Sequence, residues 1–167
     1  KERDALNCIY PKFDKNGKVV AGVYGIEEFM NAMTKTKNKV TYNFDPNFRQ
    51  FYAIELGPVP NTIGPDRFNN LRKYSAKFAT IIEMLLNPES FNKKELIYIN
   101  SVRGTGGAIS LALILRLWGF RWIKKDDETY ETEITDKTPG NFVVITSDDQ
   151  TTSEAKDIKK MIAFWNR

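Results

Sequence analysis

The chain has 167 residues, of which 41% are hydrophobic and 13% aromatic, so it can bury the core of one compact domain and is not of the disordered class. Its formal net charge of +4 favours a polyanionic partner but falls short of the strongly basic composition of a dedicated nucleic-acid-binding domain. Histidine is absent, which excludes histidine-dependent catalytic triads and most zinc sites, so an enzyme made from this chain alone would need carboxylates, lysines or a bound cofactor.

Cys8 is the single cysteine, so the chain cannot form an internal disulfide, and its surroundings in the sequence favour an intracellular, reducing compartment. The longest apolar run, residues 108–115, is too short to span a bilayer, and the charged residues 1–4 do not begin a signal peptide. We therefore expect a soluble protein with no membrane partner.

Residues 1–73 lack a sustained period and contain several chain-breaking glycines and prolines, which predicts an irregular linker or insertion segment. Within it, the apolar residues of the range 26–33 recur at helical spacing, which predicts a short helix. Basic residues follow in the range 35–39, and such a charge run is typical of a solvated helix end or loop.

Residues 74–167 have a regular pattern that predicts alternating helices and strands. Ser75 can cap a helix whose apolar face includes Phe78 and Ile82 and which Pro88 ends. The next expected elements are a buried strand over 95–100, a glycine-rich loop over 101–107, an apolar helix over 108–119, a hairpin or irregular insertion over 121–135, a buried strand over 142–146 and a helix over 151–165. This order predicts an α/β fold with a parallel sheet flanked by helices, of which the chain contains only part.

The loop over 101–107 is the first candidate for function. A glycine-rich loop before a helix presents unpaired backbone N–H groups and the positive end of the helix dipole, which suit a phosphate, and Arg103 adds a full charge. It is not a Walker loop, because no lysine lies between Arg103 and Trp122, and not a dinucleotide fingerprint, because Ile109 occupies the place of the third glycine. The alternative is a tight turn that needs glycines only for close packing.

Two acidic pairs are candidates for metal or acid–base chemistry. Asp148 and Asp149 follow the second predicted strand, but acidic residues favour helix N-termini, and this preference explains their place before a helix. Asp126 and Asp127 fit a surface turn. We therefore name no catalytic residue and no metal ligand.

Several short blocks together resemble the second RecA-like domain of superfamily 2 helicases. They lie within residues 1–11 and 74–167, and include residues 74–78 (Tyr-Ser-Ala-Lys-Phe), 96–104 (Leu-Ile-Tyr-Ile-Asn-Ser-Val-Arg-Gly), 111–115, 118–120 (Trp-Gly-Phe) and 142–147 (Phe-Val-Val-Ile-Thr-Ser). More narrowly, they resemble the helicases and early-transcription ATPases of large cytoplasmic DNA viruses of the poxvirus and asfarvirus type. The resemblance implies a partial RecA-like domain over residues 74–167, and a location in the host cytoplasm or the virion.

In such helicases, this strand and loop lie along the bound strand and contact its sugar-phosphate backbone. The resemblance therefore implies contacts with a DNA or RNA backbone from Ser101, Arg103, Gly104, Thr105, Gly106, Gly107, Thr146 and Ser147. The phosphate loop and the magnesium-binding acidic motif belong to the first RecA-like domain, and the arginine finger is expected beyond residue 167. ATP and Mg would be bound mainly by those parts of a larger parent protein, so we expect no ATP hydrolysis by this chain alone.

We therefore predict a fragment of an ATP-dependent nucleic-acid helicase or translocase, which works with the first RecA-like domain of its parent and with viral transcription machinery. Two other classes stay open. One is a Rossmann-like nucleotide-binding enzyme, although the third glycine is missing. The other is a non-catalytic interaction domain of a viral transcription or virion complex that presents Phe48, Phe51 and Tyr52 as an aromatic patch, although such residues more often lie in a core.

Overall fold

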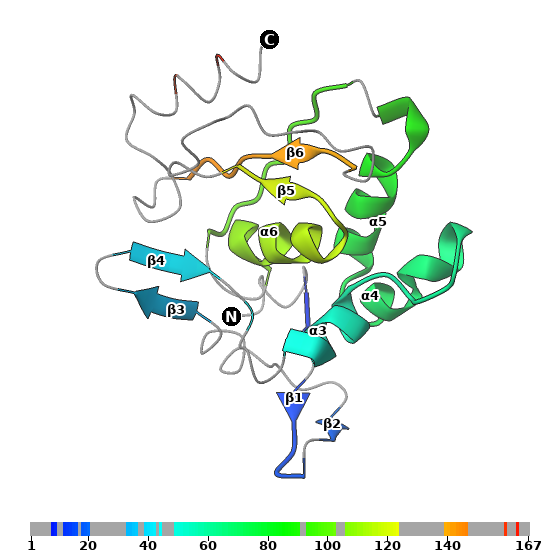
Figure 1. The fold of residues 1–167 in the computed structure, drawn as a ribbon. Helices are drawn as coiled ribbons and strands as arrows, with labels where there is room; N and C mark the ends of the chain where they lie inside the picture. Colours follow the sequence, from blue (N-terminus) through cyan, green and yellow to red (C-terminus); the bar gives the residue numbers. More distant parts are fainter. Residues whose placement is uncertain are drawn as a thin grey trace.

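The computed structural model describes residues 8–9, 12–16, 18–20, 33–36, 39–42, 44, 49–90, 93–102, 106–123, 139–146, 159 and 163. Its helices are α3 (Arg49–Leu56), the 3-10 helix η1 (Gly64–Phe68), α4 (Asn69–Tyr74), α5 (Ala76–Leu85), the 3-10 helix η2 (Pro88–Ser90) and α6 (Ala108–Leu117). Its strands are β1 (Lys12–Phe13), β2 (Val19–Val20), β3 (Met33–Thr36), β4 (Lys39–Tyr42), β5 (Arg121–Trp122) and β6 (Asn141–Phe142). Figure 1 shows α6 at the centre, with β5 and β6 above it, α5 to its right, and α3 and α4 below and to the right.

Strands β5 and β6 form a parallel pair. The backbone N–H of Arg121 donates to the carbonyl of Gly140 (3.0 Å), and the N–H of Ile123 donates to the carbonyl of Phe142 (2.9 Å). Helices together with a parallel strand pair confirm the prediction of a mixed α/β fold. The range predicted as a hairpin or insertion begins with β5, and residues 124–138 lie outside the described part.

Two short antiparallel pairs, β1 with β2 and β3 with β4, lie in the N-terminal part of the chain. The prediction of a helix over 26–33 is wrong at its last residue, because Met33 begins β3; residues 26–32 lie outside the described residues. Lys35 and Lys39 likewise lie in strands and not at a helix end. Threonine, valine and tyrosine in these strands favour extended backbone, and cross-strand pairing outweighs the weak helical spacing.

Helix α5 has the start, the apolar face and the stop that the sequence predicts. The Ser75 hydroxyl accepts a hydrogen bond from the backbone N–H of Phe78 (2.9 Å), so Ser75 is the N-cap. Phe78 and Ile82 are buried, whereas Met84 on the outer side is exposed. The 3-10 helix η2 begins at Pro88, directly after the helix.

Helix α6 is buried around its whole circumference, because every residue from 109 to 115 is at most 4% exposed. It ends at Leu117, two residues before the predicted end, and the predicted stop residue Gly119 has a φ of 89° that other residues rarely adopt. The N–H of Gly119 donates to the carbonyl of Arg116 (3.1 Å), and the N–H of Phe120 donates to that of Leu115 (3.1 Å). These two bonds form a Schellman motif, which satisfies carbonyls that the end of a helix would leave unpaired.

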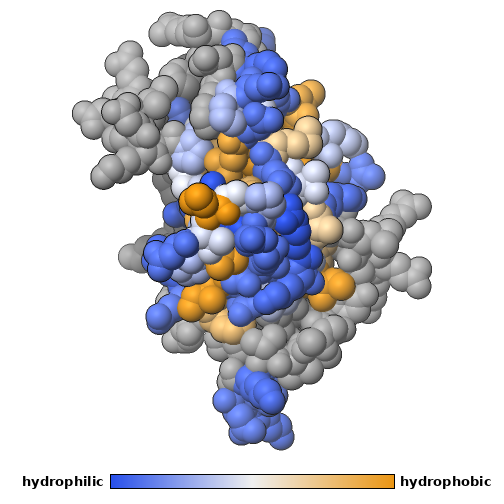
Figure 2. Space-filling view, turned by 90° about the vertical axis from the view of Figure 1, so that its right-hand side faces the viewer, coloured by the Kyte–Doolittle hydropathy of each residue, from blue (hydrophilic) through white to orange (hydrophobic). Residues whose placement is uncertain are grey.

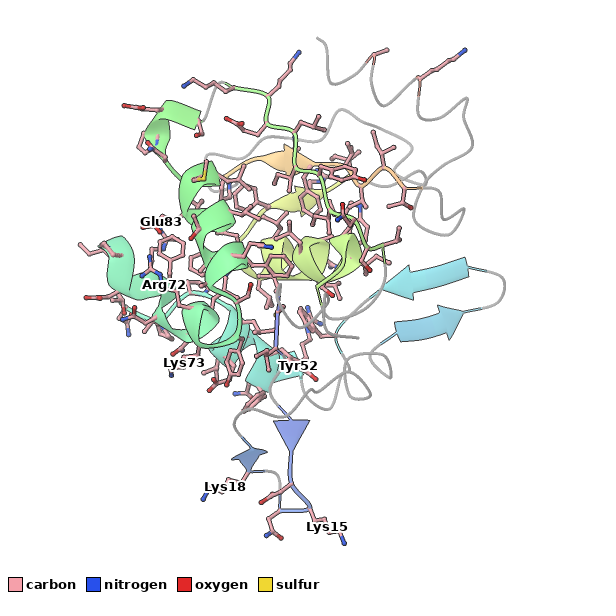
Figure 3. The ribbon with its side chains drawn as sticks, turned by 180° about the vertical axis from the view of Figure 1, so that it is seen from behind. Lys15, Lys18, Tyr52, Arg72, Lys73 and Glu83 are labelled. Carbon is pink, nitrogen blue, oxygen red and sulfur yellow. The ribbon has the colours of Figure 1, made fainter. Side chains whose placement is uncertain are left out.

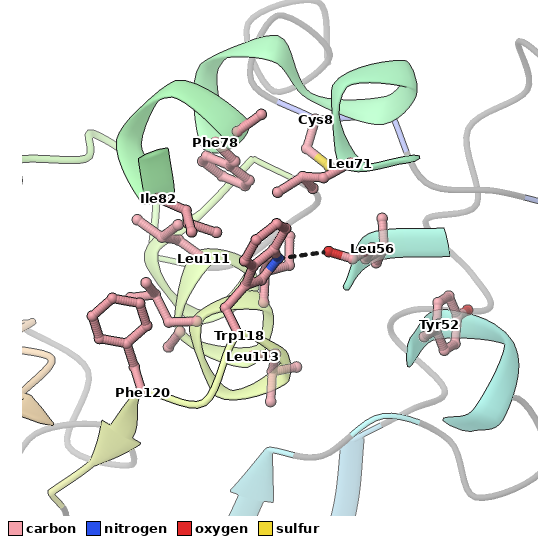
Figure 4. Close-up of a cluster of buried hydrophobic side chains, with 14 of the residues drawn as sticks. Cys8, Tyr52, Leu56, Leu71, Phe78, Ile82, Leu111, Leu113, Trp118 and Phe120 are labelled. Atoms are coloured by element: carbon pink, nitrogen blue, oxygen red, sulfur yellow. Dashed lines mark hydrogen bonds between the residues drawn. The ribbon is translucent and has the colours of Figure 1, made fainter. Parts of the chain in front are cut away.

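Trp118 joins the end of α6 to the end of α3. Its indole Nε1–H donates to the backbone carbonyl of Leu56 at 3.0 Å, across 62 residues of sequence (Figure 4). The indole also stacks on the ring of Phe68, with centroids 4.7 Å apart and planes 9° from parallel. Aromatic stacking adds to the stabilisation from burial, so this one side chain holds α6, α3 and η1 together.

The helices α3, η1 and α4 occupy residues 49–74, for which the sequence predicted irregular structure. Their buried side chains belong to the same core cluster as those of α5 and α6. Tyr52 of the predicted aromatic patch is fully buried and stacks on Phe44, with ring centroids 5.0 Å apart. Tyr52 is therefore a core residue and not an exposed docking residue; Phe48 lies outside the described residues.

Two arginines cover the outer side of this aromatic stack. The Arg67 guanidinium lies 5.2 Å from the Trp118 ring centroid and 5.5 Å from that of Phe68, and the Arg72 guanidinium lies 5.5 Å from Phe68. Arg72 also pairs with Glu83 of α5 at 2.8 Å (Figure 3). Because both partners of the ion pair are more than one-third exposed, we assign the stabilisation mainly to cation–π contact and packing.

We expect Trp118→Phe to lower the free energy of unfolding by about 1–3 kcal/mol, because it leaves the buried Leu56 carbonyl without its donor. Urea unfolding followed by circular dichroism measures the change. Tyr98→Phe, on an aromatic side chain that is 85% exposed, is the matched control and should leave the midpoint unchanged. An equally stable Trp118→Phe protein would contradict the role assigned to this hydrogen bond.

Tyr74 of α4 and Glu55 of α3 form another polar contact between helices. The phenol donates to the Glu55 carboxylate at 2.6 Å. Burial, with the hydrogen bond to Glu55 and its negative charge, raises the pKa of Tyr74 well above its usual value near 10. The phenol therefore keeps its proton in the folded protein under alkaline conditions in which the unfolded chain loses it.

This difference predicts a pH dependence of stability. The raised pKa of Tyr74 stabilises the folded state fully below about pH 10, and this contribution declines as the pH rises further, because the unfolded chain then binds fewer protons. Tyr74→Phe should therefore show a smaller alkaline loss of stability in urea unfolding. Tyrosine absorbance provides the check, because a Tyr74 that keeps its proton adds nothing to the ionisation signal of the folded protein near pH 11. The protein has seven tyrosines, so a signal about one-seventh smaller in the Tyr74→Phe variant at this pH would contradict the raised pKa of Tyr74.

Candidate functional site

Residues 95–100, predicted as a buried strand, are neither a strand nor buried. The structure assigns no strand between residues 93 and 102, and the side chains of Leu96 and Tyr98 are 96% and 85% exposed. The chain here is extended and runs in the same direction as β6, ending at the N-terminus of α6 (Figures 1 and 3). The residue types favour a strand, but a strand also requires a hydrogen-bonded neighbour, and the described residues provide none.

The loop that follows closes back on the start of α6. The backbone N–H of Ala108 donates to the carbonyl of Ser101 (2.9 Å), and the N–H of Ile109 donates to the carbonyl of Val102 (3.2 Å). These amides are two of the four that a helix N-terminus leaves unpaired, and they are the groups that the sequence assigned to a phosphate. In this conformation they are satisfied within the protein, so the α6 N-terminus does not present them to an anion.

The structure describes only some of the other predicted site residues. Gly106 and Gly107 are buried, and Gly107, at the N-cap of α6, has an ordinary φ of −83°. Ser101 is partly exposed beside them. Arg103, Gly104, Thr105 and Ser147 lie outside the described residues. Burial of the two described glycines supports close packing as one reason for glycine in this loop.

Thr146 lies at the carboxyl end of the segment that continues from β6. Only Asn141 and Phe142 pair as a strand, and residues 143–146 continue without strand pairing. The prediction of a fully buried strand over 142–146 is therefore wrong, since these residues are partly accessible and Ile145 is 53% exposed. In both ribbon views this end lies on the same side of the molecule as the end of residues 95–100 (Figures 1 and 3).

An apolar groove with a volume of about 740 Å³ separates residues 95–99 from residues 142–146. One face of α6 forms its floor, through side chains at helical spacing that include Leu111, Ala112 and Leu115. The apolar residues of the two walls were visible in the sequence as two short apolar runs. The gap between the walls was not, because the sequence predicted two strands of one sheet.

The helical side of the molecule presents a different kind of surface. Figure 2 shows it as mostly hydrophilic, with apolar atoms in separate places. Ile54, Ile63 and Met84 are the large apolar residues exposed on α3, before η1 and on α5. Scattered apolar residues of this kind are usual on a soluble surface and mark no site.

The described residues contain no cluster of three or more cysteine or acidic side chains that could hold a metal ion. Ile109, at the position of the missing third glycine, is fully buried within α6, so its side chain cannot leave room for a pyrophosphate. A Rossmann-type dinucleotide site at this loop is therefore not supported.

Comparison of the chain with protein families, with curated proteins and with solved structures gives no match. None of the helices in the described ranges has both the length and the apolar composition needed to cross a bilayer. The geometry above and the resemblance of the sequence blocks are the basis for inferring a function.

The internal pairing of the loop generates a prediction for nuclear magnetic resonance. The amide signals of Ala108 and Ile109 should exchange slowly with solvent and should keep their positions when inorganic phosphate is added, because their protons already have carbonyl partners. A phosphate-dependent shift of both signals would instead mean that the loop opens and that the α6 N-terminus binds the anion.

Proposed function

We propose that the chain is part of the second RecA-like domain of a superfamily 2 helicase or translocase, and that it contacts the sugar-phosphate backbone of a bound nucleic-acid strand. One observation carries the proposal: the end of residues 95–100 and the end of the β6 segment lie on the same side of the molecule. Ligands of open α/β sheets bind at the carboxyl ends of parallel strands, and Ser101 and Thr146 stand at the corresponding ends of the two extended segments.

The internal bonds of Ala108 and Ile109 change which groups would make these contacts. The two helix amides already have partners, so the phosphate contacts would come from the glycine-rich loop and from side chains. The groups are the backbone amides of the loop, the Arg103 guanidinium, and the hydroxyls of Ser101, Thr105, Thr146 and Ser147. Such contacts recognise the backbone without reading the bases, as a translocating protein requires. The net charge of +4 is consistent with a polyanionic partner.

ATP and Mg would enter through the parent protein. The sequence resemblance implies that both are bound mainly by the first RecA-like domain, and closure of the two domains would couple hydrolysis to movement along the strand. The same resemblance suggests a role in the transcription of a large DNA virus, in the host cytoplasm or in the virion. This chain would supply strand contacts and no catalytic residue.

A non-catalytic interaction domain is the second candidate. The apolar groove beside α6 favours it, because the exposed apolar side chains of its walls, such as Leu96 and Ile145, gather around one hollow, as is typical of a binding surface. The aromatic patch first considered for this role is not supported, since Tyr52 is buried.

Fluorescence anisotropy with labelled single-stranded and double-stranded DNA and RNA, measured across a salt series, tests the helicase proposal. Binding should weaken as salt rises, and Arg103→Ala should reduce both the affinity and, by about one, the slope of log K against log salt. Lys15→Ala is the control, because it also removes one positive charge, at the exposed tip of the β1–β2 hairpin far from α6 (Figure 3).

Gly104→Val tests the loop without changing charge and should also weaken binding. The proposal fails if nucleic acid does not bind at low salt, or if both loop variants bind as tightly as the Lys15→Ala protein. Urea unfolding of each variant shows whether a loss of binding reflects a loss of the fold.

A further inference from the structure

The groove between residues 95–99 and 142–146 has the construction of a site for an extended peptide. Its walls are two stretches of extended chain, and its floor is the apolar face of α6. Its volume of about 740 Å³ lies within the range of about 300–1,000 Å³ that is usual for ligand sites. Among the described residues proposed to contact phosphate, only Thr146 lines this groove, at the end of one wall.

The two walls leave main-chain groups unpaired. Within the described residues, no backbone hydrogen bond joins residues 95–99 to residues 143–145, and neither stretch bonds to another described segment. Unpaired N–H and C=O groups along an extended chain are the template on which a further β-strand adds.

The side chains of the walls alternate as they do in strands. Ile99 and Val144 pack against the core, whereas Leu96, Tyr98 and Ile145 are exposed. A strand placed between the walls would therefore continue the pleat of the β5–β6 sheet and place every second side chain on α6. Because the main-chain groups of both walls have no partner among the described residues, the inserted strand could be hydrogen-bonded on both sides.

We propose that this groove binds an extended, apolar peptide segment of a partner protein by β-strand addition, as a strand inserted between residues 95–99 and 143–145. The unpaired backbone groups select a polypeptide over a lipid or another purely apolar ligand, which would leave them unsatisfied. The floor favours apolar residues at alternate positions of the peptide, because it is lined by Leu111, Ala112 and Leu115.

Positive charge at the start of the first wall indicates a further property of the partner peptide. Lys93 and Lys94 are exposed at the start of the first wall, and neither forms an ion pair within the described residues. Glu95 follows them, so the two lysines outnumber the acid at this mouth of the groove. A partner strand with acidic residues at this end would complement them, which steers association and fixes the direction of the strand.

The test uses the full chain and a fluorescein-labelled synthetic peptide with two aspartates followed by alternating valine and threonine. Binding is measured by fluorescence anisotropy, and amide hydrogen exchange is followed in parallel. We expect saturable binding and slower exchange of the amides of residues 96–99 and 143–145 in the complex. The same peptide with alternate backbone nitrogens methylated is equally apolar but cannot pair, and should bind at least about tenfold more weakly.

Ile97→Pro provides the matching change in the protein. It removes a wall N–H that has no partner among the described residues, so we expect the fold to survive and the dissociation constant to rise about tenfold or more. Ile63→Ser is the control, since it removes a 91% exposed apolar side chain from another surface and should bind the peptide normally. The methylated peptide keeps the test valid if the proline variant does not fold.

Three results would overturn the proposal. Equal binding of the methylated and unmethylated peptides would mean that the groove is an apolar pocket that does not pair with the peptide backbone. Protection of the wall amides in the free monomer would mean that the walls already pair with each other. Concentration-dependent protection, with a dimer in sedimentation, would mean that a second copy of the chain covers the groove. None of these results depends on whether the chain binds nucleic acid, so the two proposals can fail independently.

Discussion

The burial of α6 is the constraint on which the rest of the structure depends. A helix that is apolar on every side has to be covered on every side, and burial of each large apolar side chain stabilises the fold by about 1.5–3 kcal/mol. The helices α3, α4 and α5 cover one side, and β5 and β6 cover another. The hydrogen bond from Trp118 to the Leu56 carbonyl fixes the end of α6 within this arrangement.

The same constraint shapes the candidate phosphate site. A buried helix cannot leave its N-terminal amides without partners, and the carbonyls of Ser101 and Val102 provide them at the cost of a ready-made anion site. The proposed phosphate contacts would therefore come from side chains and from the loop between Val102 and Gly106. The groove beside α6 shows the opposite situation, in which apolar and main-chain groups remain accessible.

Features encoded by neighbouring residues could be predicted from the sequence. The Ser75 cap needs only the backbone N–H of Phe78, three residues away, and the Gly119 stop needs carbonyls within the last turns of α6. The structure of residues 95–100 could not be predicted in this way. Their residue types favour a strand, but a strand forms only if a segment distant in the sequence pairs with it. The roles of Trp118 and Tyr74 depend on contacts with α3, and no local pattern indicates them.

The sequence by itself determined that the chain folds as a mixed α/β protein, where α5 and α6 begin and end, and which loops carry glycine, hydroxyl and arginine side chains. These properties follow from composition, from periodicity and from hydrogen bonds within a few residues. Only the tertiary structure decided that the α6 amides are occupied, that Tyr52 is core, and that an apolar groove separates two extended segments. Each of these depends on which segments, far apart in the chain, lie beside one another once α6 is buried.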